Sequence, residues 1–430
     1  MFLSGMNHDW IGEIPDHWEK QRIKNIFHLI KNPSDSPESE NILSLTMNGI
    51  VKRDISSNEG QLPETYNGYT KILINDIVIN PMDLKSGWVD KSGYSGIISP
   101  SYFVLNKNIT KTSIGYFTYQ LQRHYKEKIF FSFGQGVSYE YRWGLSRETL
   151  LNFPIVVPPF KEQQQISDYL DYKTSKIDTF IEKTQQKIEL LKEQRTSLIN
   201  TTVTKGLNPD VEMKDSGVEW IGEIPKHWSL KKITHVINMM GSGTTPKSDN
   251  KKYYEDGNIN WLVTGDLNDD YIFHTSNKIT QKALDELSSL KIYPENSLLI
   301  AMYGATIGKL GILKIETTVN QATCVLNFDD LNSVDFWFYV FLGNRNYLVS
   351  LGYGGGQPNI SQDVIKGLRF PSPPTLDEQL LIVNKIRSIL INHDEIIRVE
   401  NTRIKLLREY RQSLISSVVT GKVRVTEDMV

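Results

Sequence analysis

One ten-residue segment occurs twice in this chain, and it constrains the architecture more than any other feature. Residues 9–18 read DWIGEIPDHW and residues 219–228 read EWIGEIPKHW, so eight of the ten letters agree. The two copies lie 210 positions apart in a chain of 430 residues. Because a repeated segment of this kind indicates that one structural unit is built twice, the chain is predicted to have two related halves. Its length also favours more than one domain.

The closing part of each half is repeated as well. Residues 153–163 read FPIVVPPFKEQ and residues 370–379 read FPSPPTLDEQ, and a long helical pattern follows each of them. The prolines resist helix, so each helix is predicted to begin after them, and Gly206 and Gly421 are the predicted C-terminal stops. The predicted order is a globular block at 1–158, a helical region at 159–209, a second block at 210–373 and a second helical region at 374–430.

Both helical regions carry apolar residues at alternating spacings of three and four, the pattern of a coiled-coil seam. We favour pairing of the two helices with each other, while packing of each helix on its own block is the alternative. About 40 helical residues span roughly 60 Å, so the helices are predicted to act as a spacer. The predicted seam residues are Leu170, Ile177, Ile181, Ile188, Leu191, Leu198, Ile386, Leu390, Ile397, Ile404, Leu407 and Leu414.

The two blocks are predicted to be β-rich with short helices, which makes the chain an α+β protein. Residues 71–80 indicate a strand, a turn at Asn75-Asp76 and a second strand, and residues 97–105 indicate another strand. In the second block, strands are predicted at 297–302 and 317–328, with a glycine-rich loop between them. A second glycine-rich loop is predicted at 133–146 and at 353–361. Because the framework recurs with different loop residues, each block is expected to recognise a different target.

The loops contain side chains that can reach base edges and phosphates of DNA. The segment GSGTTPKSDNKKYY at 241–254 is the most suggestive, with small residues, hydroxyls, lysines and tyrosines together. A solvated loop without a ligand is the alternative for each loop taken singly. The candidate DNA-binding residues are Lys85, Ser86, Lys91, Tyr94, Gln135, Ser138, Tyr139 and Arg142 in the first block, and Thr244, Thr245, Lys247, Lys251, Tyr253, Tyr303, Lys309, Gln357 and Asn359 in the second.

Composition and motif searches exclude several classes of protein. The formal net charge is −2, whereas a protein that binds DNA alone is usually basic, so a basic partner is expected to help hold the duplex. The single Cys324 excludes an internal disulfide, fits a reducing cytosol and is predicted to be a buried, inert thiol. We find no transmembrane run or signal peptide, so a cytoplasmic protein is expected. We also find no P-loop, dinucleotide fingerprint or zinc spacing, so no cofactor or metal is predicted in this chain.

The combination of motifs resembles the specificity (S) subunit of type I restriction–modification systems. It consists of two variable blocks that open with WIGEIPxHW and close with a proline-rich segment, Glu-Gln and a long helix. The phrases YGATIGKLGI, followed by VNQA, and INPMDLKSG are also similar to that family. The resemblance covers nearly the whole chain.

The resemblance implies a function and a set of partners. Each block would be a target recognition domain that reads one half of a bipartite site in double-stranded DNA. The helices would form an antiparallel coiled coil that sets the spacer between half-sites and docks two modification (methyltransferase) subunits. The chain itself would be non-catalytic. S-adenosylmethionine would belong to the modification subunits, and ATP and Mg²⁺ to restriction (translocase/endonuclease) subunits.

Two other functions are compatible with parts of the sequence. One is a coiled-coil scaffold with two globular protein-binding ends, which the near-neutral charge mildly favours. The other is a methyltransferase with its own recognition domain, which the missing cofactor motifs disfavour.

Overall fold

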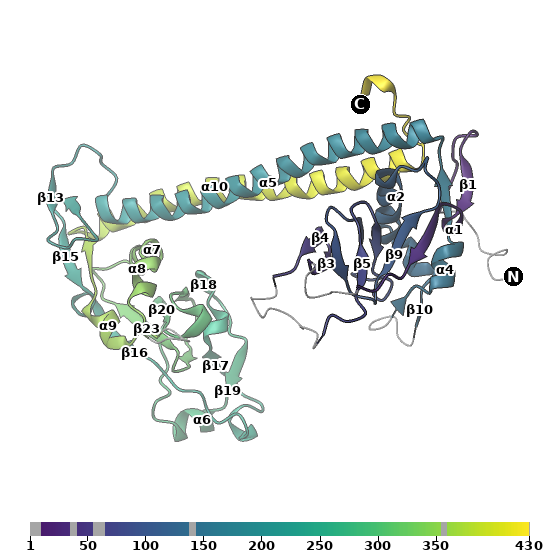
Figure 1. Ribbon diagram of the computed structural model, residues 1–430. Helices are drawn as coiled ribbons and strands as arrows, with labels where there is room; N and C mark the ends of the chain where they lie inside the picture. The colour runs from purple at the N-terminus through teal and green to yellow at the C-terminus, as the bar shows by residue number, and fades with distance from the viewer. Residues whose placement is uncertain (1–9, 35–40, 55–64, 137–142, 354–358, 430) are drawn as a thin grey trace. The chain divides into compact units, whose positions relative to one another are not determined.

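The structure is a computed structural model that describes residues 10–34, 41–54, 65–136, 143–353 and 359–429. Two long helices, α5 (Phe160–Lys205) and α10 (Leu376–Val419), accompany two β-rich blocks (Figure 1). The chain divides into two compact units. The first unit comprises residues 1–185 and 402–430, and the second comprises residues 186–401. Each unit therefore contains one block and one half of each long helix.

In the first unit, a four-stranded sheet has the order β2-β9-β6-β7, and its neighbouring strands are antiparallel. Three short sheets, β3-β4, β5-β8 and β10-β11, lie in the same block, and β1 pairs with β12. The elements of the unit are β1 (Glu19–Arg22), α1 (Ile23–Ile26), β2 (Phe27–Ile30), β3 (Leu43–Thr46), β4 (Gly49–Lys52), β5 (Thr70–Ile72), β6 (Ile77–Ile79), β7 (Val89–Lys91), β8 (Gly96–Ile98), β9 (Phe103–Lys107), α2 (Ile114–Lys126), α3 (Ile129–Ser132), β10 (Gln135–Gly136), β11 (Trp143–Gly144), α4 (Arg147–Asn152), β12 (Pro154–Val157) and η6 (Glu427–Met429).

In the second unit, a five-stranded sheet has the order β16-β23-β20-β21-β18, and β19-β17-β22 forms a second sheet. The pairs β13-β14 and β15-β24 complete the strands. The elements are β13 (Met213–Asp215), β14 (Glu223–Pro225), β15 (Ser229–Lys232), η2 (Ile233–His235), β16 (Ile237–Gly241), η3 (Lys251–Tyr253), β17 (Ile259–Leu262), η4 (Thr264–Asp266), β18 (Asp270–Ile272), β19 (Asn277–Ile279), α6 (Gln281–Glu286), β20 (Ser297–Ala301), η5 (Gly304–Thr306), β21 (Leu310–Leu313), β22 (Thr318–Val319), β23 (Thr323–Phe328), α7 (Val334–Gly343), α8 (Arg345–Ser350), α9 (Gln362–Gly367) and β24 (Arg369–Ser372).

The two blocks share one framework, as the repeat predicts. The strand order β2-β9-β6-β7 of the first block recurs as β16-β23-β20-β21 in the second. The pair β1-β12 recurs as β15-β24, in both cases joining the segment after the opening motif to the strand before the long helix. The predicted α+β class and the internal repeat are therefore confirmed.

Some strands differ from the prediction. Residues 97–105 form two strands rather than one, because the chain turns at Pro100, where proline supplies no backbone donor, and Tyr102 N donates to Ser99 O at 3.1 Å. Residues 317–328 are likewise divided between β22 and β23, which belong to different sheets. Residues 71–80 form two strands around a turn in which Asn75 has a φ of 74°. Those two strands also belong to different sheets.

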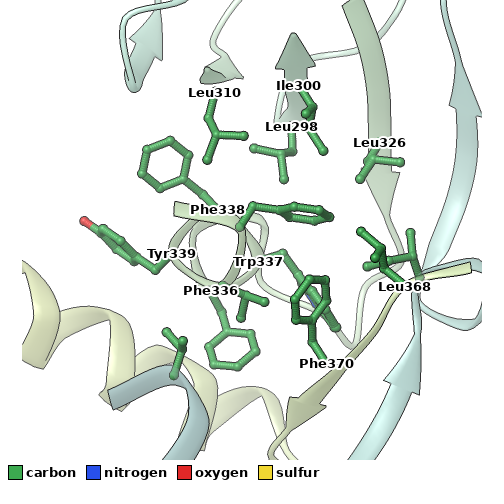
Figure 2. Close-up of a cluster of buried hydrophobic side chains, with 14 of the residues drawn as sticks. Leu298, Ile300, Leu310, Leu326, Phe336, Trp337, Phe338, Tyr339, Leu368 and Phe370 are labelled. Carbon is green, nitrogen blue, oxygen red and sulfur yellow. The ribbon is translucent and has the colours of Figure 1, made fainter. Parts of the chain in front are cut away.

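The core of the second block surrounds α7, whose sequence VDFWFYVFLG is apolar on nearly every side. A helix of that kind has to be buried all round. Figure 2 shows Trp337 and Phe338 of α7 below the side chains of Leu298 and Leu310, which come from the sheet. The Ser333 side chain caps α7 by accepting a hydrogen bond from Phe336 N.

The opening motif of each half binds the start of a long helix. Trp18 Nε1 donates to Glu162 at 2.9 Å, and His17 Nε2 lies 2.8 Å from the same carboxylate. In the second unit, Trp228 Nε1 donates to Glu378 at 2.8 Å, and His227 Nε2 lies 3.1 Å from it. The His-Trp pair and the distant glutamate are therefore repeated together because they form one contact.

The glutamine that follows each glutamate caps a helix of the block. Gln163 Oε1 accepts a hydrogen bond from Ser113 N at 3.0 Å, where α2 begins. Gln379 Oε1 accepts from Ser333 N at 2.8 Å, where α7 begins. The repeated Glu-Gln pair thus joins the opening segment, the block and the long helix at one place.

The opening motifs also contact the ends of the long helices. Gly421, which follows α10, lies against Pro15 and Trp18, and Gly206, which follows α5, lies against Trp228. Each opening segment therefore holds the start of one long helix and the end of the other. This explains why the segment is needed twice.

The long helices pair antiparallel within each unit. In the first unit, Arg411 Nε lies 2.9 Å from Asp178. In the second, Arg195 Nε lies 3.6 Å from Asp394. Each Arg and each Asp is displaced by 216 positions from its counterpart, so the two ion pairs occupy the same position of the repeat.

The residues predicted for the seam are covered in this pairing. Counting Leu170 as position d of a heptad, they occupy positions a and d of both helices. Half of them are buried, namely Leu170, Ile177, Ile188, Ile386, Leu390 and Ile404, and the others are half-buried. The two proposed packing modes both occur, because Leu170 of α5 also joins the core of the first block and Ile386 of α10 joins that of the second.

Candidate nucleic-acid interface

Two loops of the first block are joined by backbone hydrogen bonds. The loop after β6 is closed where Asn80 N donates to Trp88 O at 3.0 Å. The hairpin β10-β11 is joined to this loop where Leu145 N donates to Pro81 O at 2.7 Å. The loop is defined here as the β6–β7 loop, residues 81–87.

The second block repeats these hydrogen bonds. Ala301 N donates to Lys309 O at 2.8 Å, and Ile360 N donates to Met302 O at 2.9 Å. The β20–β21 loop, residues 302–308, therefore has the same length and the same anchoring as its counterpart. Ser146 and Ser361 then cap α4 and α9 directly after the two equivalent donors. Each block thus presents one loop at the carboxyl end of a central strand, and the segment before α4 or α9 anchors it.

Several predicted residues of the first block lie in these loops. Lys85 and Ser86 are exposed, and their backbone N–H groups both donate to Asp83 Oδ1 at 2.9 Å, which fixes the turn. Lys128 Nζ donates to Lys85 O at 2.6 Å. Gln135 is exposed on β10. Lys85, Ser86 and Gln135 therefore belong to one region.

Two other predicted residues of the first block lie elsewhere. Lys91 Nζ lies 3.7 Å from Asp171 of α5, so this ammonium faces the long helix. Tyr94 is exposed in the turn between β7 and β8, and Lys52 Nζ lies 5.3 Å from the centre of its ring. These two residues are not brought together with the loops.

In the second block, Tyr303, Lys309 and Asn359 are brought together. Asn359 forms backbone bridges to Tyr303 and to Tyr353, and Lys309 closes the β20–β21 loop. Tyr353 was missed by the sequence analysis, although its side chain is 76% exposed. Its position at the base of a glycine-rich loop was the available signal.

The segment at 241–254 carries the remaining predictions of the second block. The Thr244 carbonyl accepts from Trp261 Nε1 at 3.2 Å, and the Thr245 hydroxyl donates to Gln321 at 2.7 Å. Lys247 and Lys251 are exposed. The Tyr253 hydroxyl donates to Glu286 at 2.9 Å, a contact that raises the pKa of Tyr253. Thr244 and Thr245 thus have hydrogen bonds within the block, and the lysines face solvent.

Some predictions cannot be placed. Ser138, Tyr139, Arg142 and Gln357 lie outside the described residues. The DNA-binding role of every residue above stays a prediction.

Further features of the described part of the chain concern metal-ligand groups, membrane-spanning helices and the one cysteine. Among those residues, no group of three or more His, Cys, Asp and Glu side chains could hold a metal ion. No helix among them is long and apolar enough to cross a membrane. Cys324 is buried, as predicted, and burial raises the pKa of its thiol to about 12, so the nucleophilic thiolate is disfavoured.

One lateral face of the paired helices carries apolar side chains in both units and, in the first unit, also Lys173, Lys176, Lys183 and Arg403. It is defined here as the g/c face, the residues at heptad positions g and c in 173–201 and 389–417. These positions include no aspartate or glutamate. In the first unit, Phe180 and Leu406 are 62% and 58% exposed on this face, and Leu190 and Ile396 are 63% and 41% exposed in the second. The other exposed apolar residues on it are Val399 and Tyr410.

Comparison with known proteins identifies the family. Residues 15–190 and 225–409 match the type I restriction modification DNA specificity domain. The putative type I restriction enzyme MjaX specificity subunit of Methanocaldococcus jannaschii is 22% identical over 436 residues, with 96% of both chains covered. The MjaVIII specificity subunit of the same organism is 24% identical over 443 residues, with 96% of this chain and 94% of the relative covered.

Solved structures share the fold. A chain from a study of complex assembly and conformational transition in the type I R-M system has a TM-score of 0.66 at 14% identity, covering 96% of this chain and all of that one. The HsdS subunit from Thermoanaerobacter tengcongensis has a TM-score of 0.50 at 16% identity, covering 96% of this chain and 98% of its own. Since the specificity domain matches twice and covers most of the sequence, the chain belongs to the family of type I restriction–modification specificity subunits.

Proposed function

We propose that this chain is the non-catalytic DNA-reading subunit of a cytoplasmic type I restriction–modification complex. Each block reads one half of a bipartite site, and the long helices set the spacing between the half-sites. The observation that carries the proposal is the pair of equivalent loop anchors: matched hydrogen bonds hold loops of equal length but different sequence at the same place in both blocks. A scaffold that reads two different sequences requires this combination. Family membership does not favour the alternative of a protein-binding scaffold.

The modification subunits supply the chemistry in this proposal. They carry S-adenosylmethionine, and restriction subunits carry ATP and Mg²⁺. Because the chain has a net charge of −2, it depends on these partners for part of the phosphate neutralisation that DNA binding needs.

The g/c face is the proposed docking surface for the modification subunits. Exposed leucine at the same repeat position in both halves, Leu190 and Leu406, suits a partner that binds in two copies. In the first unit, the cations on this face and the absence of carboxylates favour a partner surface that combines apolar and acidic side chains. The aspartates of the helix-pair ion bridges, Asp178 and Asp394, lie at position e, on a different side of their helices.

Charge introduction on this face tests docking. Leu190→Asp together with Leu406→Asp should abolish co-purification of the modification subunit while leaving the helix content unchanged, since both side chains are solvent-exposed. Leu381→Asp is the matched control, because Leu381 is 61% exposed on α10 but lies outside the g/c face. Retention of the partner by the double variant would contradict the proposed surface.

The function itself is tested by expressing the chain with its neighbouring genes and mapping methyladenine in DNA from the same cells. A bipartite methylated motif that disappears when this chain is deleted supports the proposal. Replacement of residues 230–360 by another recognition block should change one half of the motif and leave the other unchanged. Absence of any methylation that depends on this chain would reject the proposed function for it.

A further inference from the structure

One position in each block carries an exposed apolar side chain at the start of the anchored loop. Met82 follows Pro81 in the β6–β7 loop and is 60% exposed, and Tyr303 follows Met302 in the β20–β21 loop and is 38% exposed. The preceding residue accepts the equivalent backbone hydrogen bond in each block, from Leu145 in one case and from Ile360 in the other. Met82 and Tyr303 therefore occupy the same place in the framework.

Covering the exposed apolar area at this place with a ligand would favour binding by about 25 cal/mol for each Å² removed from water. The backbone on either side is fixed by hydrogen bonds, so these side chains are presented from ordered positions. Asn359 adds a backbone bridge to Tyr303. Lys85, in the same loop as Met82, is exposed and cationic. An apolar group beside polar and cationic groups suits the edge of a base pair, because the thymine methyl group offers an apolar contact in the major groove.

The two equivalent positions carry different residues. Met82 and Tyr303 differ in shape, planarity and hydrogen-bonding capacity while their surroundings are conserved between the blocks. That pattern is expected where two different base sequences are read by one framework.

We propose that Met82 and Tyr303 are equivalent specificity-determining residues, each making the apolar contact to a base pair in the half-site that its own block reads. This inference rests on the proposed function and assigns two residues to it. Sequence analysis assigned Tyr303 to DNA binding without a counterpart and omitted Met82, because the anchoring bonds that equate them join segments far apart in the chain.

The test uses the full chain co-expressed with its neighbouring genes, and the probe is a plasmid library with randomised sequence whose methyladenine is mapped. Met82→Ala should lower discrimination at one position in one half of the motif by at least about fivefold, the lower end of the cost of one mismatched base pair. Tyr303→Ala should do the same in the other half only. Met82→Tyr and Tyr303→Met should alter the preferred base at the same two positions.

Controls separate this effect from a loss of folding or assembly. Ile74→Ala and Leu331→Ala remove side chains that are 58% and 76% exposed on other turns of the two blocks, and both should leave the motif unchanged. The thermal midpoints of all variants should stay close to that of the parent, as is usual for surface substitutions. An unchanged motif in both test variants, or equal losses in both halves, would overturn the assignment while leaving the function intact. A parent chain that directs no methylation would instead reject the proposed function, and the assignment with it.

Discussion

At the scale of single residues, a glutamate in each half connects segments that are distant in sequence. Glu378 accepts hydrogen bonds from the buried Trp228 indole and lies beside His227. Glu162 does the same with Trp18 and His17, about 145 positions away. A charged acceptor for a buried indole N–H makes a stronger hydrogen bond than a neutral one. These contacts explain why the Trp residues and the Glu-Gln pairs recur together.

Removal of one of these carboxylates should destabilise its unit. Glu378→Ala leaves the Trp228 N–H without its acceptor, and we expect a loss of about 1–2 kcal/mol in the free energy of unfolding, because the glutamate is partly exposed and water can replace it in part. Urea denaturation measures the loss. Asp377→Ala, in the same first turn but exposed, is the control and should cost less. Equal losses in the two variants would show that the Trp228 contact contributes nothing beyond the helix terminus.

A second residue-scale prediction concerns His124, which is buried among Trp10, Phe130 and Phe153. Its Nδ1 has no hydrogen-bond partner among the described residues. Burial, assisted by the nearby Arg123 charge, holds the pKa of His124 well below its ordinary value near 6.5. The folded state therefore binds this proton less readily than the unfolded state does. Stability from this group is present above pH 6.5 and is lost as the pH falls below it.

The loss in the free energy of unfolding between pH 7.5 and 5.5 should be on the order of 1 kcal/mol from this residue. The measurement is the free energy of unfolding at both pH values for the parent and for His124→Leu. The variant should retain a smaller dependence on pH, since the carboxylates and the other histidines remain in both proteins. An identical pH dependence in the two proteins would contradict a neutral, buried His124.

Sequence reasoning succeeds at the residue scale where the signal is local. The burial of Cys324 follows from an alternating strand pattern, and the coverage of Ile188 and Ile404 follows from heptad spacing. It fails where partners are distant: nothing near Glu162 in the sequence indicates Trp18, and nothing near Met82 indicates its equivalence to Tyr303. Residue type also does not reveal where a side chain points, since Lys91, at the end of β7, faces Asp171 of α5.

At the scale of elements, the ends of the two long helices can be compared directly. Gly206 and Gly421 both have a φ of +75°, the left-handed conformation in which other residues are strained. A Cβ at Gly206 would lie 3.3 Å from Trp228. A Cβ at Gly421 would lie 2.5 Å from Pro15 Cδ, which is closer than real contacts allow.

Gly206→Ala should therefore lower the free energy of unfolding by about 1–2 kcal/mol through backbone strain alone. Gly421→Ala should cost at least about 1 kcal/mol more, because the proline ring has to shift. Thermal or urea unfolding of both variants measures the difference. Equal effects would indicate that the opening segment around Pro15 moves away from the helix end without cost.

The prediction of elements was reliable for the long helices and less so for the strands. The heptad pattern extends over many turns, so α5 and α10 are evident from sequence. Strands of two to six residues depend on their partners instead, which is why residues 317–328 read as one strand but divide between two sheets. Pairing partners are set by tertiary contacts that short apolar runs do not encode.

At the scale of the whole molecule, the order of blocks and helices along the chain does not correspond to its compact units. Each unit combines a block with the first half of the helix that follows that block and the second half of the other helix. The sequence presents a linear series of four regions. The opening segments contact the glycines at the ends of the long helices, Gly206 and Gly421. These contacts join the linear series into two units of the same construction.

The proposed role of the helices as a spacer gives the last prediction. Insertion of one heptad into both helices, after Gln186 and after Thr402, keeps the a/d pattern and the pairing of both halves, because these points are equivalent in the repeat. Seven residues add about 10 Å of helix, so the half-sites should move apart by about three base pairs at 3.4 Å each. Mapping of the methylated motif measures the spacing. A heptad inserted into α5 alone is the control. It should abolish methylation, because the residues of α5 beyond the insertion no longer face their partners on α10. An unchanged spacing in the double insertion would mean that the helices do not determine the distance between the half-sites, even if the two blocks still read them.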